Sequence, residues 1–320
     1  MVQFGYKLMT EEHGPRELVE NACRAEDAGF DFVAISDHFH PWLEAEGHAS
    51  FAWSVLGAIA QATKNVGIAT GVTCPIMRYH PAIIAQAAAT IGVMSEDRFT
   101  LAVGTGERLN EHVVGQGWPE IEERRERLEE AIDIIRTLWE GETCSYDGGY
   151  FTVENARLYD LPNKAIPLLV AAGGQSAAEL AGKCGAGLMA TEADKGLVGA
   201  WRKAGGKGSV YGEIGMGYAA TKKEGLALAH KYHRFSALGW GPMTELPTVS
   251  IFEAATKFVR EEDIEGHVPF GPDPDPYIKE IRKFVDAGFD HIALTAIGPE
   301  QLSFIKFFND ELGPALKSLR

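Results

Sequence analysis

The sequence predicts an α/β fold, a single (β/α)8 TIM barrel with insertion loops, and three observations lead to that prediction. A helix-period run, a small residue with glycine, and a short apolar strand occur together three times, at 25–36, 181–191 and 285–295. Glycine just past a helix end takes the left-handed conformation at little cost, so each repeat indicates a helix followed directly by a strand. Apolar strands alternating with amphipathic helices are typical of a parallel sheet covered by helices. Eight strands over 320 residues match the size of a (β/α)8 barrel.

The expected strands are short apolar runs separated by helix-period segments. In order they are Gln3–Met9, Phe32–Ser36, Val66–Val72, Phe99–Val103, Leu168–Ala172, Gly187–Thr191, Val210–Ala220 and His291–Thr295. A doubly wound open sheet would show the same alternation. The sequence therefore leaves the closure of the barrel open.

Four insertions interrupt the alternation. Residues 41–50 and 107–119 are loops after the second and fourth strands, and residues 144–158, with paired glycines and aromatic residues, suggest a hairpin. Residues 231–262 contain a Gly-Trp-Gly-Pro segment and suggest a lid of short helices. None has the composition of an interdomain linker, so we expect residues 1–320 to form one domain.

The charge balance excludes one class of partner. The chain has 45 acidic and 30 basic side chains, a formal charge of −15, whereas nucleic-acid binding depends on clustered Lys and Arg. No apolar stretch is long enough to span a membrane, and the first residues lack the pattern of a signal peptide. The four cysteines are far apart, as expected for reduced thiols. We therefore expect a cytoplasmic protein that acts on a small molecule.

Polar and small residues follow several strands at their carboxyl ends, where (β/α)8 barrels carry their chemistry. Asp37 and His38 follow the second strand, and Cys74 follows the third. The fourth is followed by a segment from Gly104 to His112, and the fifth by Gly173–Ser176. We expect these segments, distant in the chain, to converge on one rim.

The histidines at 38 and 40 allow two interpretations. An H-x-H pair suits a metal ion, but barrel metallohydrolases also need ligands after later strands, which end here in glycines and Thr295. The preferred interpretation makes His38 an acid or base at near-neutral pH and His40 a turn residue that contacts backbone. We expect no metal site.

The glycine-rich segments are ambiguous when each is taken alone. Gly104–Glu107 fails the dinucleotide pattern because Leu109 stands where glycine is needed; it could accommodate a flat ligand, or be a plain strand-to-helix turn. Gly173–Ser176 could present amides to a phosphate, or be a turn with Ser176 as the helix N-cap. Cys74 is expected to be a packing residue, since no neighbour in sequence would activate its thiol.

Four blocks in order make the chain resemble a known group. They are Ser36–Trp42 (SDHFHPW), Thr70–Tyr79 (TGVTCPIMRY), Val103–Glu111 (VGTGERLNE) and Ala171–Gly174 (AAGG). The chain resembles, nearly end to end, the F420-dependent (deazaflavin-dependent) glucose-6-phosphate dehydrogenase group of the luciferase-like oxidoreductase superfamily. The resemblance implies a (β/α)8 barrel, coenzyme F420 as cofactor, and a homodimer.

The resemblance also implies roles for individual residues. His38 and Glu107 would be the catalytic acid–base residues, the histidine handling the substrate proton and the glutamate the ring nitrogen, with the two roles exchangeable. Trp42 would wall the substrate pocket, Asp37 would lie at the coenzyme, and Gly71–Val72 would form a cis peptide bulge behind its ring. The remaining coenzyme contacts implied are Cys74, Thr105, Gly106 and Asn110 near the ring, and Gly173, Gly174, Ser176 and Ala177 around the phosphate and tail.

The implied substrate site departs from the sugar-phosphate pattern. Members that bind a sugar phosphate hold it with two lysines and an arginine; here the substrate-side candidates are Thr191, Lys195 and His267, and the stretch 245–249 has no lysine. Two of three cations are therefore missing, which at roughly 1.5–3 kcal/mol for each hydrogen bond to a charged group weakens a phosphate site. A neutral sugar, a secondary alcohol or another carbonyl pair is at least as good a candidate.

Two other functions fit the same barrel. One is an FMN-dependent luciferase-like monooxygenase, and the other is a catalytically silent cofactor-binding protein. The presence of Asp37, His38 and Glu107 together argues against the silent protein.

Overall fold

The computed structural model describes residues 1–319 and contains a closed parallel barrel in the order β1-β10-β9-β8-β7-β4-β3-β2. Closure, which the sequence left open, is thereby settled, and the predicted (β/α)8 barrel is confirmed. The barrel strands are β1 (Gln3–Leu8), β2 (Phe32–Ile35), β3 (Gly67–Thr70), β4 (Phe99–Val103), β7 (Leu168–Ala171), β8 (Gly187–Ala190), β9 (Val210–Met216) and β10 (His291–Ala296). All eight lie within the predicted segments or extend them by one residue.

Alternation along each strand separates two apolar layers. On β2, Phe32 and Ala34 belong to a cluster inside the barrel, whereas Val33 and Ile35 belong to the larger cluster outside it. The inner cluster also contains Ala69, Ala102, Leu169, Met189, Tyr211 and Ala293. The interior uses small residues around the Phe32 ring, which lies so close to β1 that a Cβ on Gly5 would be 2.4 Å from it. Side chains therefore fill the interior near the amino-terminal ends of the strands, and the barrel is not a pore.

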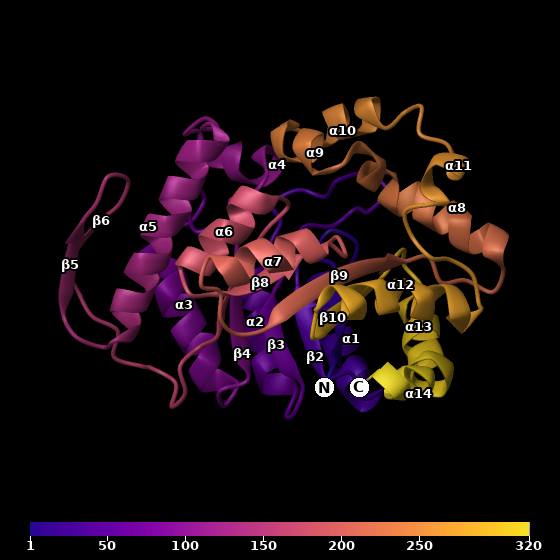
Figure 1. The fold of residues 1–320 in the computed structure, drawn as a ribbon, viewed down its shortest axis with the longest axis horizontal. Coiled ribbons are helices and arrows are strands. Elements are labelled where there is room, and N and C mark those ends of the chain that lie inside the picture. Colours follow the sequence, from indigo (N-terminus) through magenta and orange to yellow (C-terminus); the bar gives the residue numbers. More distant parts are fainter. Residues whose placement is uncertain (320) are drawn as a thin grey trace.

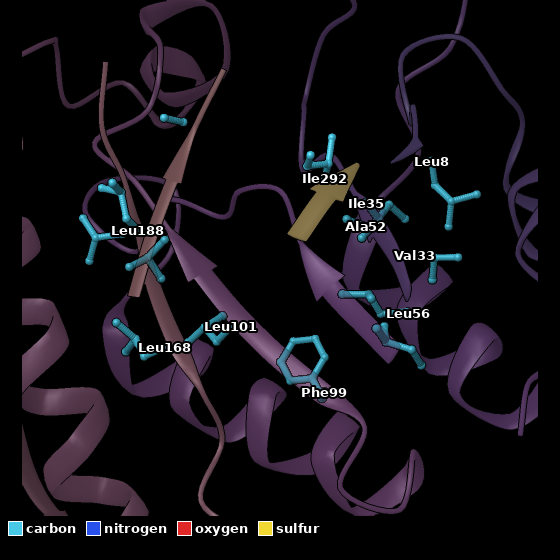
Figure 2. Close-up of a cluster of buried hydrophobic side chains, with 14 of the residues drawn as sticks. Leu8, Val33, Ile35, Ala52, Leu56, Phe99, Leu101, Leu168, Leu188 and Ile292 are labelled. Atoms are coloured by element: carbon cyan, nitrogen blue, oxygen red, sulfur yellow. The ribbon is translucent and has the colours of Figure 1, made fainter. Parts of the chain in front are cut away.

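The outer layer packs the strands against the helices (Figure 2). Figure 2 shows Val33 and Ile35 of β2 beside Ala52 and Leu56 of α2, all of them buried. Each fully buried aliphatic side chain of this size contributes about 1.5–3 kcal/mol. The helices are α1 (Pro15–Asp27), α2 (Ala52–Ala62), α3 (Pro81–Met94), α4 (Arg108–Glu111), α5 (Ile121–Trp139), α6 (Gln175–Lys183), α7 (Lys195–Lys203), α8 (Lys222–His233), α9 (Trp240–Glu245), α10 (Val249–Ala255), α11 (Glu261–Ile264), α12 (Pro274–Ala287), α13 (Gln301–Phe307) and α14 (Gly313–Leu316).

The insertions lie outside the barrel wall. The antiparallel hairpin of β5 (Cys144–Asp147) and β6 (Thr152–Ala156) stands beside α5, as predicted for residues 144–158 (Figure 1). Glu130 of α5 accepts hydrogen bonds from the amides of Gly149 and Phe151 at its tip, at 3.0 and 2.8 Å. The expected lid of short helices is present as the 3₁₀ segment Arg234–Leu238 with α9, α10 and α11. In Figure 1 it covers one end of the molecule, and the N-terminus and α14 lie at the other.

Two local predictions differ from the structure. The seventh strand ends at Met216 rather than at residue 220, because Gly217 leaves the barrel to form an isolated bridge with Phe270. Helix α6 begins at Gln175 with Gly174 as its N-cap, so the alternative of Ser176 as the cap was wrong. Among residues 1–319, no helix combines the length and apolar composition needed to cross a membrane.

Candidate active site

The segments singled out in the sequence occupy one half of the barrel rim. They follow β2, β3, β4, β7 and β8, which are consecutive neighbours in the closed sheet. Because parallel strands end at the same edge, their carboxyl-terminal loops are brought together over this half. The expected convergence is therefore a direct consequence of strand order.

Asp37 ties the end of β2 to the segment after β3. Its carboxylate accepts hydrogen bonds from the Thr73 hydroxyl at 2.5 Å, from the Tyr79 hydroxyl at 2.9 Å and from the Arg78 guanidinium at 3.1 Å. Burial alone would lower the pKa of Arg78, but Asp37 and Glu111 together raise it. Asp37 therefore holds the segment after β3 against the end of β2, beside His38.

His38 has the surroundings of an acid–base residue. Its Nδ1 lies 3.2 Å from Glu11 Oε1 and 3.3 Å from the His40 carbonyl, both acceptors, so we place the ring proton on Nδ1. Within residues 1–319 the Nε2 atom has no hydrogen-bond partner, and the side chain keeps 11% of its surface exposed. A neutral imidazole held in this way presents a basic Nε2 to a ligand.

Glu11 is a candidate functional residue that the sequence analysis missed. It follows β1, is 1% exposed, and accepts hydrogen bonds from the hydroxyls of Ser36 and, at 3.2 Å, Thr10. A carboxylate on the far nitrogen of an imidazole fixes its tautomer and stabilises the imidazolium. The rule applied to the other strands, that polar residues after a strand face the rim, would have found it.

Asn110 and Glu107 lie next to the His38 loop. The Asn110 side-chain oxygen accepts hydrogen bonds from the amides of Phe39 and His40, at 2.9 and 3.1 Å, and its nitrogen lies 3.5 Å from Glu107. His40 Nδ1 meets the Leu109 carbonyl at 3.0 Å, which confirms it as a turn histidine. Asn110 therefore holds the loop and leaves the half-buried Glu107 carboxylate at the rim.

Trp42 joins His38 to the lid. Its ring lies 4.8 Å from the His38 ring in an edge-on arrangement and stacks on Phe235 of the lid at 5.1 Å. The surrounding cluster, which we call the roof cluster, is apolar; its buried members are Trp42, Leu43, Leu109, Phe235, Met243 and Phe252. Trp42 therefore connects the His38 side chain directly to the roof cluster.

The glycines after β3 and β4 have packing reasons of their own. The Gly71–Val72 peptide bond is cis, as the resemblance implied, and the Gly71 carbonyl accepts a hydrogen bond from Lys7 at 2.6 Å. A Cβ on Gly104 would be 2.9 Å from Val72, and one on Gly106, which has a φ of +73°, would be 2.8 Å from Glu111. These two glycines are therefore required by the protein's own packing, whatever a ligand requires.

Cys74 and Thr105 complete this part of the rim. Cys74 is 4% exposed, and a Cβ on Gly106 would lie 3.3 Å from its Sγ, so the side chain is closely packed. Burial, followed by the charges of Glu111 and Glu107, raises the pKa of the Cys74 thiol. The cysteine is thus a neutral packing residue, as expected, and Thr105 beside it is half-buried.

The turn before α6 is open to solvent. Gly173, Gly174 and Ser176 are exposed, Ala177 is half-buried, and a Cβ on Gly174 would meet nothing within 4 Å. The first amides of α6, a nine-residue helix without a side-chain cap, are free for an anion.

The substrate-side candidates lie farther around the rim. The Thr191 hydroxyl accepts a hydrogen bond of 2.7 Å from Trp240 of the lid, and Trp240 also approaches Gly173. Lys195 is exposed at the start of α7, and His267 is exposed on the segment after α11. His267 lies near the half-buried His233, whose pKa is lowered to about 4 by desolvation and then by His267.

The lid is fastened to the rim by Glu245. Its carboxylate accepts hydrogen bonds from Arg124 at 2.7 Å and from the Trp118 indole at 3.0 Å, and the Arg124 guanidinium lies 4.1 Å from the Trp118 ring centre. Arg124 is 2% exposed, although it belongs to a highly charged helix segment.

In the described part of the chain, no group of three or more His, Cys, Asp or Glu side chains is arranged to hold a metal ion.

Comparisons with known proteins agree on a family. A sequence model described as luciferase-like monooxygenase matches residues 1–204. The chain is 38% identical to an F420-dependent glucose-6-phosphate dehydrogenase of Segniliparus rotundus and 37% identical to one of Rhodococcus erythropolis, with 99% of this chain covered in each case and 99% and 98% of the relatives.

Two solved structures share the fold. An F420-dependent secondary alcohol dehydrogenase in complex with an F420-acetone adduct superposes with a TM-score of 0.91, at 32% identity and 99% coverage of both chains. The coenzyme F420 dependent tetrahydromethanopterin reductase of Methanopyrus kandleri superposes at 0.75 with 19% identity and 99% coverage of both chains, which supports the fold alone.

Proposed function

The chain belongs to the luciferase-like monooxygenase family, and we propose that it is an oxidoreductase that transfers hydride between an alcohol carbon and the deazaflavin coenzyme F420. The observation that carries the proposal is the His38–Glu11 pair, which stands on the same rim as the free amides before α6. The relatives of 37–38% identity and the structure of 32% identity, all named as F420-dependent, support the choice of coenzyme.

The residues present fit this coenzyme. When bound, F420 supplies a carbon atom that accepts hydride and does not favour one-electron chemistry with oxygen. The exposed Gly173–Gly174 turn and the dipole of α6 suit its phosphate. The cis Gly71–Val72 segment, with Cys74, Thr105 and Gly106, would lie against its ring. Since the chain carries a charge of −15, recognition of an anionic coenzyme depends on these local groups and not on long-range attraction.

His38 is the base in this proposal. In alcohol oxidation Nε2 takes the hydroxyl proton while the substrate carbon loses hydride, and Glu11 stabilises the imidazolium through Nδ1. Glu107, whose carboxylate lies 3.5 Å from the Asn110 side-chain nitrogen, would be the proton donor for the coenzyme ring. Asn110 contacts both Glu107 and the loop that carries His38, and Asp37 ties the start of that loop to the segment after β3.

The substrate is an alcohol or ketone without a phosphate. Trp42, which adjoins His38, belongs to the apolar roof cluster, which cannot solvate a dianion. The Thr191 hydroxyl already binds Trp240, and the stretch 245–249 provides Glu245 instead of a lysine. Lys195 and His267 are exposed. Because solvent screens exposed charges, they would attract a phosphate group only weakly.

The protein in this proposal is a cytoplasmic homodimer. Helix α3 carries apolar residues on its outer face as well as its inner one: Ile83 and Val93 are 57% and 45% exposed. A helix that is apolar all round is usually buried, and a second copy would bury it. The four cysteines are all free, as in a reducing compartment.

The test is a substrate panel with each cofactor. Purified protein is titrated with F420 and with FMN, and then incubated with oxidised F420 and either 2-propanol, glucose or glucose 6-phosphate. The proposal expects F420 to bind and its absorbance to fall with an unphosphorylated alcohol. Tight binding of FMN with no binding of F420 would identify a flavin monooxygenase instead.

A further inference from the structure

Three glutamates are buried together behind His38. Glu11 and Glu12 lie on the loop after β1, and Glu46 lies on the loop after β2, the strand next to β1 in the barrel. They are 1%, 7% and 4% exposed, respectively. Acidic side chains are almost never buried without a charged partner.

Their surroundings differ. Glu11 has His38 and two hydroxyl donors, so its charge is well stabilised. Glu12 accepts only the Gly298 amide, at 2.7 Å, and Glu46 accepts the Leu43 amide at 2.8 Å. The second oxygen of each, Oε1, is buried without a hydrogen-bond partner in the described chain. Neither forms an ion pair there.

Among the described residues, no Lys or Arg forms an ion pair with these carboxyls. The other titratable groups around the cluster are Tyr6, His38, His13, Glu17 and His48. His13 is itself buried, with Nδ1 3.4 Å from Glu17 and Nε2 unpartnered, and burial lowers its pKa. Three carboxylates that share a buried region with so little positive charge cannot all be ionised.

We propose that Glu12 and Glu46 are positioning residues for His38: both stay neutral carboxyls, so that Glu11 is the only one of the three buried glutamates that carries a charge behind the imidazole. In this state His38 is a neutral base that can take the substrate proton. Ionisation of Glu12 or Glu46 would add negative charge behind Glu11 and stabilise the imidazolium form of His38, which has no free Nε2 to accept the substrate proton. The inference rests on the role proposed for His38.

The electrostatics support this assignment. Burial raises the pKa of Glu12 to about 8, opposed by the Gly298 hydrogen bond and assisted by the charge of Glu11. Burial, then the charges of Glu11 and Glu12, raise the pKa of Glu46 well above its usual value, opposed by the backbone amides of Leu43 and Trp42. The loop that Glu46 holds through Leu43 also carries Trp42, so the cluster and the substrate wall are mechanically connected.

The test is a titration of His38 in the protein without coenzyme. Nitrogen-15 NMR of the ten histidines is followed from pH 5 to 9.5, with His38 identified by loss of its signal in His38→Asn. The wild type is expected to show a second inflection of the His38 shift near pH 8, where Glu12 ionises. The double variant Glu12→Gln/Glu46→Gln, which keeps the shape of both side chains, is expected to lose it.

Glu44→Gln is the matched control, since it removes an exposed carboxylate from the same loop and should leave the second inflection in place. If the double variant is unfolded, the two single variants are titrated instead, and at least one should move the inflection. A single-step titration in the wild type that both glutamine variants leave unchanged would overturn the proposal.

An activity arm separates this inference from the proposed function. With an accepted alcohol, the pH profile of wild-type kcat/KM should show a step near pH 8, where Glu12 ionises, and the double variant should lack that step. If no alcohol reduces F420, the proposed function fails, yet the NMR result still decides the charge state of the cluster.

Discussion

At the residue scale, the acid–base group depends on a carboxylate that the sequence does not mark by any motif. Glu11 and His38 lie 27 positions apart and meet because β1 and β2 are neighbours in the barrel. A Glu11→Gln variant keeps the shape but loses the charge that stabilises the imidazolium. We expect kcat to fall by about 10²-fold or more with coenzyme affinity unchanged. Glu17→Gln, which changes a more exposed carboxylate 3.4 Å from His13, should stay within about twofold. Equal losses in both variants would contradict the assigned role.

A second prediction concerns stability and pH. The pKa of Glu12 is about 8 in the folded protein and near 4.5 when unfolded, so the folded state holds an extra proton between these values. Stability due to this group is therefore full below about pH 4.5 and lost as pH rises towards 8, by an amount of the order of a few kcal/mol. Glu12→Gln should flatten the fall in melting temperature between pH 5 and pH 8. If the melting temperature falls as steeply between pH 5 and pH 8 in Glu12→Gln as in the wild type, the prediction is contradicted.

A third prediction tests whether glycine is needed at the rim. Gly106 has a φ of +73°, and a Cβ there would be 2.8 Å from Glu111. Gly106→Ala should destabilise the protein by about 1–3 kcal/mol in denaturant unfolding. Gly199→Ala is the control, because Gly199 lies within α7 with nothing within 4 Å of its added Cβ, and it should stabilise by about 0.5–1 kcal/mol. The same sign for both variants would contradict this account.

At the element scale, the lid is a separate set of short helices whose position depends on side-chain contacts with the rim. Glu245 at the end of α9 binds Arg124 and Trp118, and Phe235 stacks on Trp42. Weakening one of these contacts should therefore reduce the affinity for the substrate, seen as a higher KM, and leave the rate of the chemical step, seen as kcat, nearly unchanged. Because Glu245 is half exposed, its pair with Arg124 is worth at most about 1 kcal/mol.

Glu245→Gln is therefore expected to raise KM by roughly two- to fivefold with little change in kcat. High salt should raise the wild-type KM towards that of the variant and leave the variant unchanged. Glu261→Gln, an exposed substitution on α11, should match the wild type. A fall in kcat with constant KM in Glu245→Gln would mean that the residue acts on the chemistry and not on the lid.

The sequence predicted the elements well and their surroundings less well. All eight barrel strands were located, because continuous apolar runs after helix-ending glycines are local features. The end of β9 was misplaced because it depends on a pairing of Gly217 with the distant Phe270. The segment 122–130 has the composition of a solvated helix face, with a pair such as Arg127–Glu123, yet Arg124 is buried and Glu130 binds the hairpin. Burial of a charge depends on tertiary contacts that composition does not reveal.

At the scale of the whole molecule, strand order explains why the candidate site could be predicted from separate segments. The loops after β2, β3, β4, β7 and β8 are neighbours only because the sheet closes in this order, and the sequence gives the loops without the order. Glu11 and Glu12 were missed because they follow β1, which borders this half of the rim from the other side of β2. The roof over His38 was likewise not predictable, since it joins Trp42 to lid residues more than 190 positions away.

The central claim is that the protein oxidises an unphosphorylated alcohol with F420, using His38 as the base. The most direct measurement is the initial rate of F420 reduction with 2-propanol and with glucose 6-phosphate, for the wild type and for His38→Ala. The account predicts reduction with the neutral alcohol, at least tenfold lower kcat/KM with the sugar phosphate, and a loss of about 10²–10⁴-fold in the variant. A faster rate with glucose 6-phosphate, or full activity of His38→Ala, would contradict it.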